Sequence, residues 1–211
     1  MTTHTFTRKE EIVHAITHGV GILLSKVALL VMLMYAVYNG SIWHIVSGTV
    51  FGGTMLLMYV ASTISHGLPF GKLKDLFQII DHSSIYLFIA GTYTPILLIP
   101  LRGELGWTMF SVVWAIAIIG VIFKIFFVKR FLILSTIIYV LMGWLIVLAW
   151  EPLTASLPSD GVIFLVTGGI FYTVGAIFYV WRKFLYHHAV WHIFVLAGSA
   201  FHFFTIFLYI L

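Results

Sequence analysis

Long apolar runs constrain what this chain can fold into more than any other feature of its sequence. Each run is long enough to cross about 30 Å of hydrocarbon as a helix, and none shows the alternating pattern of a membrane β-barrel. Of the 211 residues, 62% are hydrophobic and only 9% are charged. We therefore predict an all-α integral membrane protein, a seven-transmembrane-helix bundle. The predicted spans are residues 17–38, 43–65, 79–100, 107–128, 131–150, 161–181 and 188–211.

The connections between these spans are short, which is typical of sequential antiparallel helices in one bundle. We expect a short cytoplasmic N-terminal segment at residues 1–16 and a single seven-helix transmembrane domain at residues 17–211. Residues 1–11 are polar and no small-residue cleavage pattern follows the first apolar run, so we expect no signal peptide to be removed.

Turn and small residues add local detail. Asn39-Gly40 predicts a turn, and the stretch from Pro152 to Pro158, with Ser159-Asp160, predicts a loop. Pro95 suggests a bend in the third span, and Gly168-Gly169 suggests close helix packing.

The basic residues predict how the bundle is oriented. They gather before the first span and near the connections between spans two and three, four and five, and six and seven, whereas the opposite side has only Arg102. By the positive-inside rule the N-terminus is cytoplasmic and the C-terminus is outside. We interpret these charges as topology signals and membrane anchors and expect no nucleic-acid partner. Lys26 falls inside the first span and fits neither role. The basic residues on the predicted inner side are Arg8, Lys9, Lys72, Lys74, Lys124, Lys129, Arg130, Arg182 and Lys183.

Side chains that can bind metal reach the cytoplasmic level from three predicted spans. His188 and His192 lie one turn apart on the same helix face, which is a metal-ligand spacing. His66 ends the second span on the inner side, and Asp81 begins the third span there. Ionisable groups at this depth are costly unless they are paired, hydrated or bound to a cation. We therefore predict that His66, His188 and His192 bind a metal ion.

The chain has no cysteine, so only nitrogen and oxygen ligands are available, and Zn²⁺ is the first choice before other transition metals. Three histidines leave an open position, as in catalytic zinc sites. Asp81 then has two possible roles: it is a direct fourth ligand, or it acts as general base for an attacking water. Ser62 either bonds a ligand, a water or a developing oxyanion, or it bonds back to its own helix.

The remaining histidines have simpler interpretations. His82 and His187 precede or follow site residues and point to other faces, and His44 lies at the outer interface. His18 lies near the level of the site, where it can contact a metal ligand without binding the ion itself. His202 is about 15 Å deeper by helix rise. We expect it to be a buried hydrogen-bonded histidine, with a place in a cavity or proton path as the alternative.

Five parts of the sequence carry a family resemblance: Ser62-Thr-Ile-Ser-His66, the stretch from Asp81 to Pro95, His188-Ala-Val-Trp-His192, Glu11 and Thr17-His18-Gly19. They resemble the Ser-x3-His, Asp and His-x3-His pattern of the hemolysin III family. That family is the bacterial branch of the progestin and adipoQ receptor group, which is related to alkaline ceramidases. The resemblance covers nearly the whole chain. It implies seven spans with the N-terminus inside, zinc held by His66, His188 and His192, Asp81 beside the zinc water, and a multi-pass location in a bacterial cytoplasmic membrane.

Two functions stay open. In the adiponectin-receptor and ceramidase relatives, similar sites are associated with hydrolysis of a ceramide amide, so the first is a zinc-dependent hydrolase of a membrane lipid amide or ester, with catalytic Asp81 and Ser62. The alternative is a non-enzymatic hemolysin III-type membrane protein in lipid or membrane homeostasis or haemolysis, with zinc as a structural staple. A selective ion channel is disfavoured because few ionisable groups lie at mid-depth. The expected partner is membrane lipid, and the sequence predicts neither a substrate nor an oligomeric state.

Overall fold

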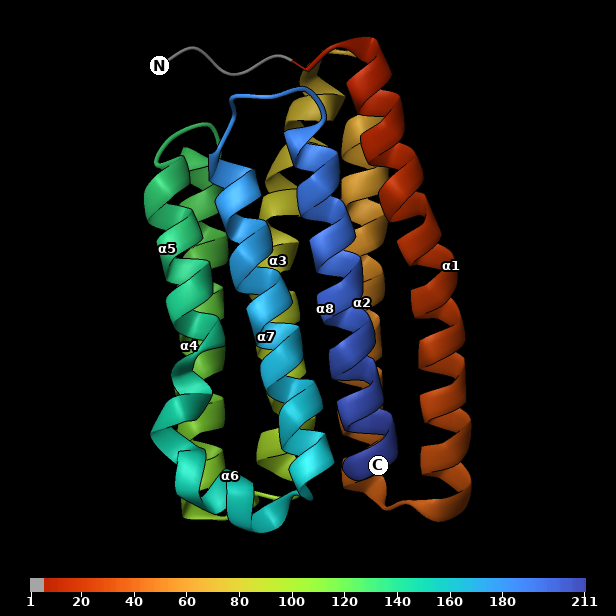
Figure 1. The fold of residues 1–211 in the computed structure, drawn as a ribbon, viewed down its shortest axis with the longest axis vertical. Helices are drawn as coiled ribbons and strands as arrows, with labels where there is room; N and C mark the ends of the chain where they lie inside the picture. Colours follow the sequence, from red (N-terminus) through yellow and green to blue (C-terminus); the bar gives the residue numbers. More distant parts are fainter. Residues whose placement is uncertain (1–5) are drawn as a thin grey trace.

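The structure, a computed structural model, describes residues 6–211, which form α-helices joined by short connections and one short 3₁₀ segment (Figure 1). The predicted all-α class is confirmed. Residues 1–5 of the predicted N-terminal segment lie outside the described residues. The elements are α1 (Arg8–Asn39), α2 (Ile42–Gly67), α3 (Lys72–Leu98), α4 (Glu104–Phe127), α5 (Leu132–Gly143), η1 (Leu145–Ala149), α6 (Trp150–Ser156), α7 (Ser159–Val180) and α8 (His187–Tyr209).

Among the described residues, six helical stretches are long and apolar enough to cross a membrane, which makes the chain a multi-pass membrane protein. These are α1, α2, α4, the stretch Leu132–Ser156, α7 and α8. The predicted third span coincides with α3, but α3 is not among the six. It packs against α2 and α4, and most of its residues from Asp81 to Leu98 are buried. Its polar side chains therefore face protein, so the helix can be less apolar than its lipid-facing neighbours.

One predicted loop was wrong. The stretch from Pro152 is helical, because α6 runs from Trp150 to Ser156. Pro152 lies in the first turn of α6, where a main-chain N–H would have no helical partner, so proline costs little there. Only Leu157 and Pro158 separate α6 from α7. The predicted turn at Asn39-Gly40 is confirmed, since it joins α1 to the N-cap residue Ser41 of α2.

Helix α1 begins well before the apolar run that marks its span. Thr7 caps it with a capping box: its hydroxyl accepts from the main-chain N–H of Glu10, and the Glu10 carboxylate accepts from the N–H of Thr7. The helix therefore starts at Arg8, about 13 Å of helix rise ahead of residue 17. This extension carries Glu11 and His14 to the end of the bundle where α8 begins.

Helix packing brings four helix ends together. Helix α1 lies beside α2 and α8, α2 packs on α3, and α7 packs on α8 (Figure 1). The start of α1 and the end of α8 lie at opposite ends of the bundle (Figure 1). The start of α1, the end of α2 and the starts of α3 and α8 consequently share one end.

Lys124 departs from its predicted role as a membrane anchor. Its side chain is only 1% exposed, and its ammonium group donates a hydrogen bond of 2.7 Å to Oγ of Ser135. It also lies 5.7 Å from the ring centre of Tyr139. Lys124 therefore ties α4 to α5 inside the bundle. Lys26, by contrast, is exposed on the outer face of α1.

Helices α7 and α8 approach closely at Gly168, as the paired glycines suggested. A methyl group added to Gly168 would overlap the ring of His202, whereas one added to Gly169 would meet Trp144 at an ordinary 3.4 Å. His202 is buried, and its Nε2 donates to the main-chain oxygen of Leu165 at 3.1 Å. His202 is therefore a buried hydrogen-bonded histidine, as predicted, and it also lines a cavity within the bundle, which was the predicted alternative.

This contact gives a test of the packing. Gly168→Ala should lower the free energy of unfolding by about 1–3 kcal/mol, because a side chain is forced into an occupied space. Gly169→Ala is the matched control and should be neutral or stabilising by up to about 1 kcal/mol, because alanine favours the helix. Thermal unfolding of both variants in detergent measures the difference, and equal stability of the two variants would contradict the packing.

Candidate metal centre

Three histidines from two helices converge at the shared end of the bundle. His66, His188 and His192 each place one possible ligand atom within 4.8 Å of the others. Their ring centres are 4.6 Å apart for His188 and His192, 5.0 Å for His66 and His188, and 5.3 Å for His66 and His192. The two α8 histidines lie one turn apart in its first turns, and His66 lies in the last turn of α2. This group could hold a metal ion.

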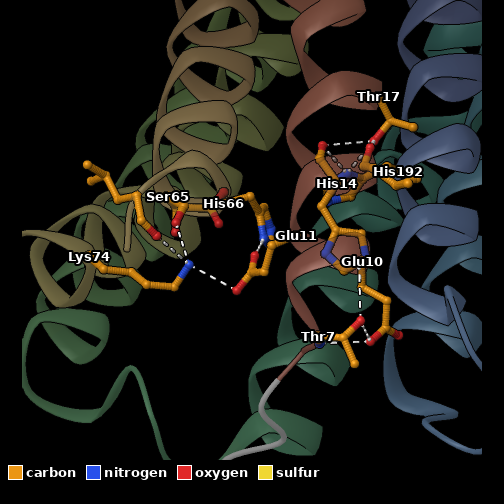
Figure 2. Close-up of polar contacts among 12 residues, drawn as sticks. Thr7, Glu10, Glu11, His14, Thr17, Ser65, His66, Lys74 and His192 are labelled. Carbon is orange, nitrogen blue, oxygen red and sulfur yellow. Dashed lines mark hydrogen bonds and ion pairs between the residues drawn. The ribbon is translucent and has the colours of Figure 1, made fainter. Parts of the chain in front are cut away.

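Helix α1 fixes the protonation of two of these rings (Figure 2). Nδ1 of His66 lies 2.6 Å from Oε2 of Glu11, and a carboxylate only accepts, so Nδ1 carries the proton. Nδ1 of His192 likewise donates to the main-chain oxygen of His14 at 3.2 Å, and it lies 2.9 Å from Oγ1 of Thr17. In both rings Nε2 is left with the lone pair that a metal ion needs, and partners of this kind are typical of metal-binding histidines.

Glu11 is itself held in place. Its other oxygen, Oε1, is paired with Nζ of Lys74 at 2.9 Å (Figure 2). Lys74 also donates to the main-chain oxygens of Ser65 and Leu68, at 2.9 and 3.3 Å. Lys74 therefore joins the start of α3 to the end of α2, and it orients the carboxylate that orients His66.

An aromatic ring packs against the cluster. The ring centre of Phe6 is 4.7 Å from that of His14 and 5.2 Å from that of His188. Glu10 adds a tie to the connection before α8, because its Oε1 accepts from the N–H of Tyr186 at 3.2 Å. An apolar cover of this kind limits water around the imidazoles and strengthens polar interactions beneath it.

Ser62 and Asp81 lie beside the histidines. Both line a cavity of about 20 Å³, together with His18, His188 and His192. A cavity of about 10–15 Å³ is enough for one water molecule, so this space has the size of a single water. Neither of the two groups of possible metal ligands among residues 6–211 includes Asp81. Asp81 lines the small cavity instead.

A larger cavity of about 100 Å³ adjoins the small one. The two share the lining residues Met58, Ile85, Tyr179, Trp191 and Val195. The larger cavity extends into the bundle between α3, α5, α7 and α8, and reaches Trp144 and His202. Most of its lining is apolar or aromatic, so the water-sized space that Ser62 and Asp81 line lies next to an apolar interior.

The residues present fit a transition-metal ion. Nε2 of His66 is enclosed and has no hydrogen-bond partner among residues 6–211, although buried polar atoms normally have one. The donors that converge here are imidazole nitrogens, which suit Zn²⁺ and its neighbours in the first transition row and are poor ligands for Ca²⁺ or Mg²⁺.

The other histidines take different places. The His18 ring stacks on His192, with ring centres 3.4 Å apart and planes 12° apart. Nδ1 of His82 donates to the main-chain oxygen of Gln78, and Nδ1 of His187 donates to that of Phe178. His44 belongs to the capping box of α2 at the opposite end.

Sequence reasoning gave too little weight to α1. Glu11 enters only through the family resemblance, and no role was predicted for His14 or for the Thr17 hydroxyl. Lys74 was predicted only as a topology signal and membrane anchor. A usable signal was present, since Glu11, His14 and His18 are spaced three and four residues apart and therefore lie on one helix face.

The helical architecture and the histidine cluster together define a multi-pass membrane protein with a candidate metal centre at one end of its bundle. Comparison with known proteins shows which family this is: the chain belongs to the haemolysin-III related family, whose model matches residues 6–203. It is 55% identical to the hemolysin-3 homolog of Bacillus subtilis (strain 168) over 204 residues, which is 97% of this chain and 96% of that protein. It is 51% identical to hemolysin-3 of Bacillus cereus over 203 residues, 96% of this chain and 93% of that protein.

A more distant similarity reaches animal proteins. The chain is 26% identical over 174 residues to the human monocyte to macrophage differentiation factor, covering 80% of this chain and 72% of that protein. The predicted relationship to the hemolysin III family is therefore confirmed.

The role of α1 in orienting the ligands can be tested at Thr17. Thr17→Val removes the hydroxyl next to Nδ1 of His192 and should weaken zinc binding by about tenfold, as is typical when a partner of a metal ligand is lost. Thr49→Val is the matched control, because that hydroxyl is exposed and bonds only within its own helix. Competition with a chelator measures both affinities, and an unchanged zinc affinity in Thr17→Val would contradict the assigned role.

Proposed function

We propose that this chain is a zinc-dependent hydrolase that acts on an amide or ester of a membrane lipid. The observation that carries the proposal is that two cavities of different character lie next to each other in the bundle. The three-histidine group lies at a water-sized cavity that His188 and His192 line together with Ser62 and Asp81, and this cavity adjoins a larger apolar one. A polar reaction centre and an apolar binding space in direct contact suit a lipid with a hydrolysable headgroup bond.

In this proposal Zn²⁺ held by His66, His188 and His192 would supply Lewis acidity, which polarises a carbonyl and activates water at neutral pH. Asp81 takes the proton of the attacking water as general base, because its carboxylate lines the cavity that a water fits. Its absence from the described ligand groups supports this role over direct ligation.

Other side chains position the reacting groups. The Ser62 hydroxyl lines the same cavity and donates a hydrogen bond to the carbonyl oxygen as negative charge develops on it. Glu11 and Thr17 hold the rings of His66 and His192 in place. The apolar cavity is smaller than the roughly 300–1,000 Å³ of common ligand pockets. It therefore takes only part of an acyl chain, and the remainder stays in the bilayer.

The activity test uses purified protein with lipid amides and esters in mixed micelles. Asp81→Asn should lower turnover by about 10²–10⁴-fold while the zinc content stays, because the amide cannot take the proton. His188→Ala should abolish turnover together with tight zinc binding. His44→Ala, at the other end of the bundle, is the control and should be fully active. Turnover that does not depend on His188, or no turnover of any lipid amide or ester, would contradict the proposed hydrolase activity.

The proposal includes an orientation. We propose seven spans, with α3 as the third and least apolar, a cytoplasmic N-terminus, and a location in a bacterial cytoplasmic membrane. Three features support it: basic residues gather near the metal centre, α1 begins and α8 ends at opposite ends of the bundle, and the Bacillus relatives match over almost their whole length. The metal centre then lies at the cytoplasmic surface, where water and polar products can exchange.

Cysteine labelling checks this orientation, because the chain has no cysteine of its own. Glu104→Cys, exposed at the start of α4, should react with a membrane-impermeant maleimide in intact cells. Arg130→Cys, exposed between α4 and α5, should react only after the cells are permeabilised. The reverse pattern would show that the bundle has the opposite orientation.

A second function, a non-enzymatic membrane protein with zinc as a staple, is favoured by the network around the site. Contacts of Glu11, Lys74 and Thr17 link α1, α2, α3 and α8, so an ion at the histidines would fasten elements already tied together. The two Bacillus relatives carry the name hemolysin-3. Removal of zinc that lowers the melting temperature, with haemolysis but no lipid turnover in the zinc-loaded protein, would support this function over hydrolysis.

A further inference from the structure

A second group of metal-competent side chains lies next to the proposed zinc ligands, and the proposed hydrolysis does not use it as a ligand set. Glu11, His14 and His66 each place one possible ligand atom within 4.8 Å of the others. Glu11 and His14 are three residues apart on α1 and face the same side, toward His66 at the end of α2. We propose that these three side chains form a second binding position for a divalent transition metal, which is an alternative to the first because both positions use Nε2 of His66.

His14 is the residue that points to a ligand. Its side chain is 0% exposed, and neither ring nitrogen has a hydrogen-bond partner among residues 6–211. Its ring centre lies 4.8 Å from that of His66, close to the spacing among the proposed zinc ligands. His202, also buried, donates to a main-chain oxygen instead. Burying an imidazole with both nitrogens unpaired costs free energy, and a bond from one nitrogen to a metal ion offsets part of that cost.

The donor set specifies the class of ion. Two imidazoles and one carboxylate are a ligand combination known from catalytic zinc sites, and imidazoles favour Zn²⁺, Co²⁺ and similar ions over Ca²⁺ and Mg²⁺. Glu11 contributes the negative charge that partly compensates the ion.

Lys74 sets the strength of this second position. Its ammonium lies 2.9 Å from Oε1 of Glu11, while Oε2 of Glu11 lies 2.6 Å from Nδ1 of His66. An incoming cation must share the carboxylate with Lys74 and is repelled by the ammonium. The second position is therefore weaker than the three-histidine position, and it takes an added ion only when the three-histidine position cannot form.

The test measures metal binding in a variant that lacks the two α8 ligands of the first position. In the double variant His188→Ala/His192→Ala, added Co²⁺ should bind at about one ion per chain, with a visible absorption spectrum typical of nitrogen and oxygen ligands. Adding His14→Ala or Glu11→Gln should weaken this binding by at least about tenfold. Adding His18→Ala, the matched control from the same helix face and equally buried, should leave it unchanged.

Lys74→Met in the same background provides an opposite effect. Loss of the competing ammonium should tighten Co²⁺ binding by about tenfold, because Glu11 becomes fully available to the ion. An unchanged or weaker affinity in Lys74→Met would overturn the proposal.

Two further results would also overturn it. One is a double variant that elutes as a folded helical protein but binds no Co²⁺. The other is residual binding that does not respond to His14→Ala. Neither measurement involves lipid turnover, and both use a variant that lacks the proposed zinc ligands of α8, so failure of the hydrolase and failure of this second position give different results.

Discussion

The hydrogen bond between Glu11 and His66 is the interaction on which the arrangement of this end of the bundle depends. It places a carboxylate from α1 against a metal-competent imidazole at the end of α2, and Lys74 completes the contact from α3. A carboxylate, an ammonium and several imidazoles at the edge of an apolar bundle are expensive unless each has a partner. Here these groups are each other's partners. The contacts that orient His66 therefore also fix the positions of α1, α2 and α3 relative to one another.

Helix α1 therefore does more than cross the membrane. Its capped extension ahead of the apolar run carries Glu11 and His14 to the level where α8 begins, and Thr17 follows at the start of that run. From there it sets the protonated nitrogen of His66 and of His192, through a carboxylate, a main-chain oxygen and a hydroxyl. The ligands that sequence spacing points to belong to α2 and α8, but α1 determines which ring atoms are free to bind.

The sequence predicts the helices well and the site in part. Apolar runs predict the long helices, because a segment surrounded by lipid must satisfy its main-chain groups internally. They do not predict the polar first turns of α1 and α3, which begin at Arg8 and Lys72 rather than at residues 17 and 79. The run at α3 is weaker, since burial among other helices relaxes the demand for apolar residues. The helix at Pro152 was missed because proline is a breaker except in a first turn. Topology alone brings His66, Asp81 and His188 to one end.

Contacts between helices are what the sequence cannot supply. Lys124 has the same residue type as the membrane anchors around it, and only the folded structure shows that its ammonium is buried and bonded to Ser135 of α5. The partnership of Glu11 with His66 joins residues 55 positions apart. The apolar cavity exists because α3, α5, α7 and α8 leave space between their side chains, a property of packing rather than of any motif.

The most direct test of the central claim is the metal content of the detergent-purified protein, measured by mass spectrometry after dialysis into metal-free buffer without chelator. The native chain and His202→Ala should each retain about one zinc ion, whereas His188→Ala should retain almost none. His202 is the informative comparison, because it is also buried on α8 but is bonded to Leu165, away from the cluster. No zinc or other transition metal in the native protein, or equal metal in the native chain and His188→Ala, would contradict a metal centre at these histidines.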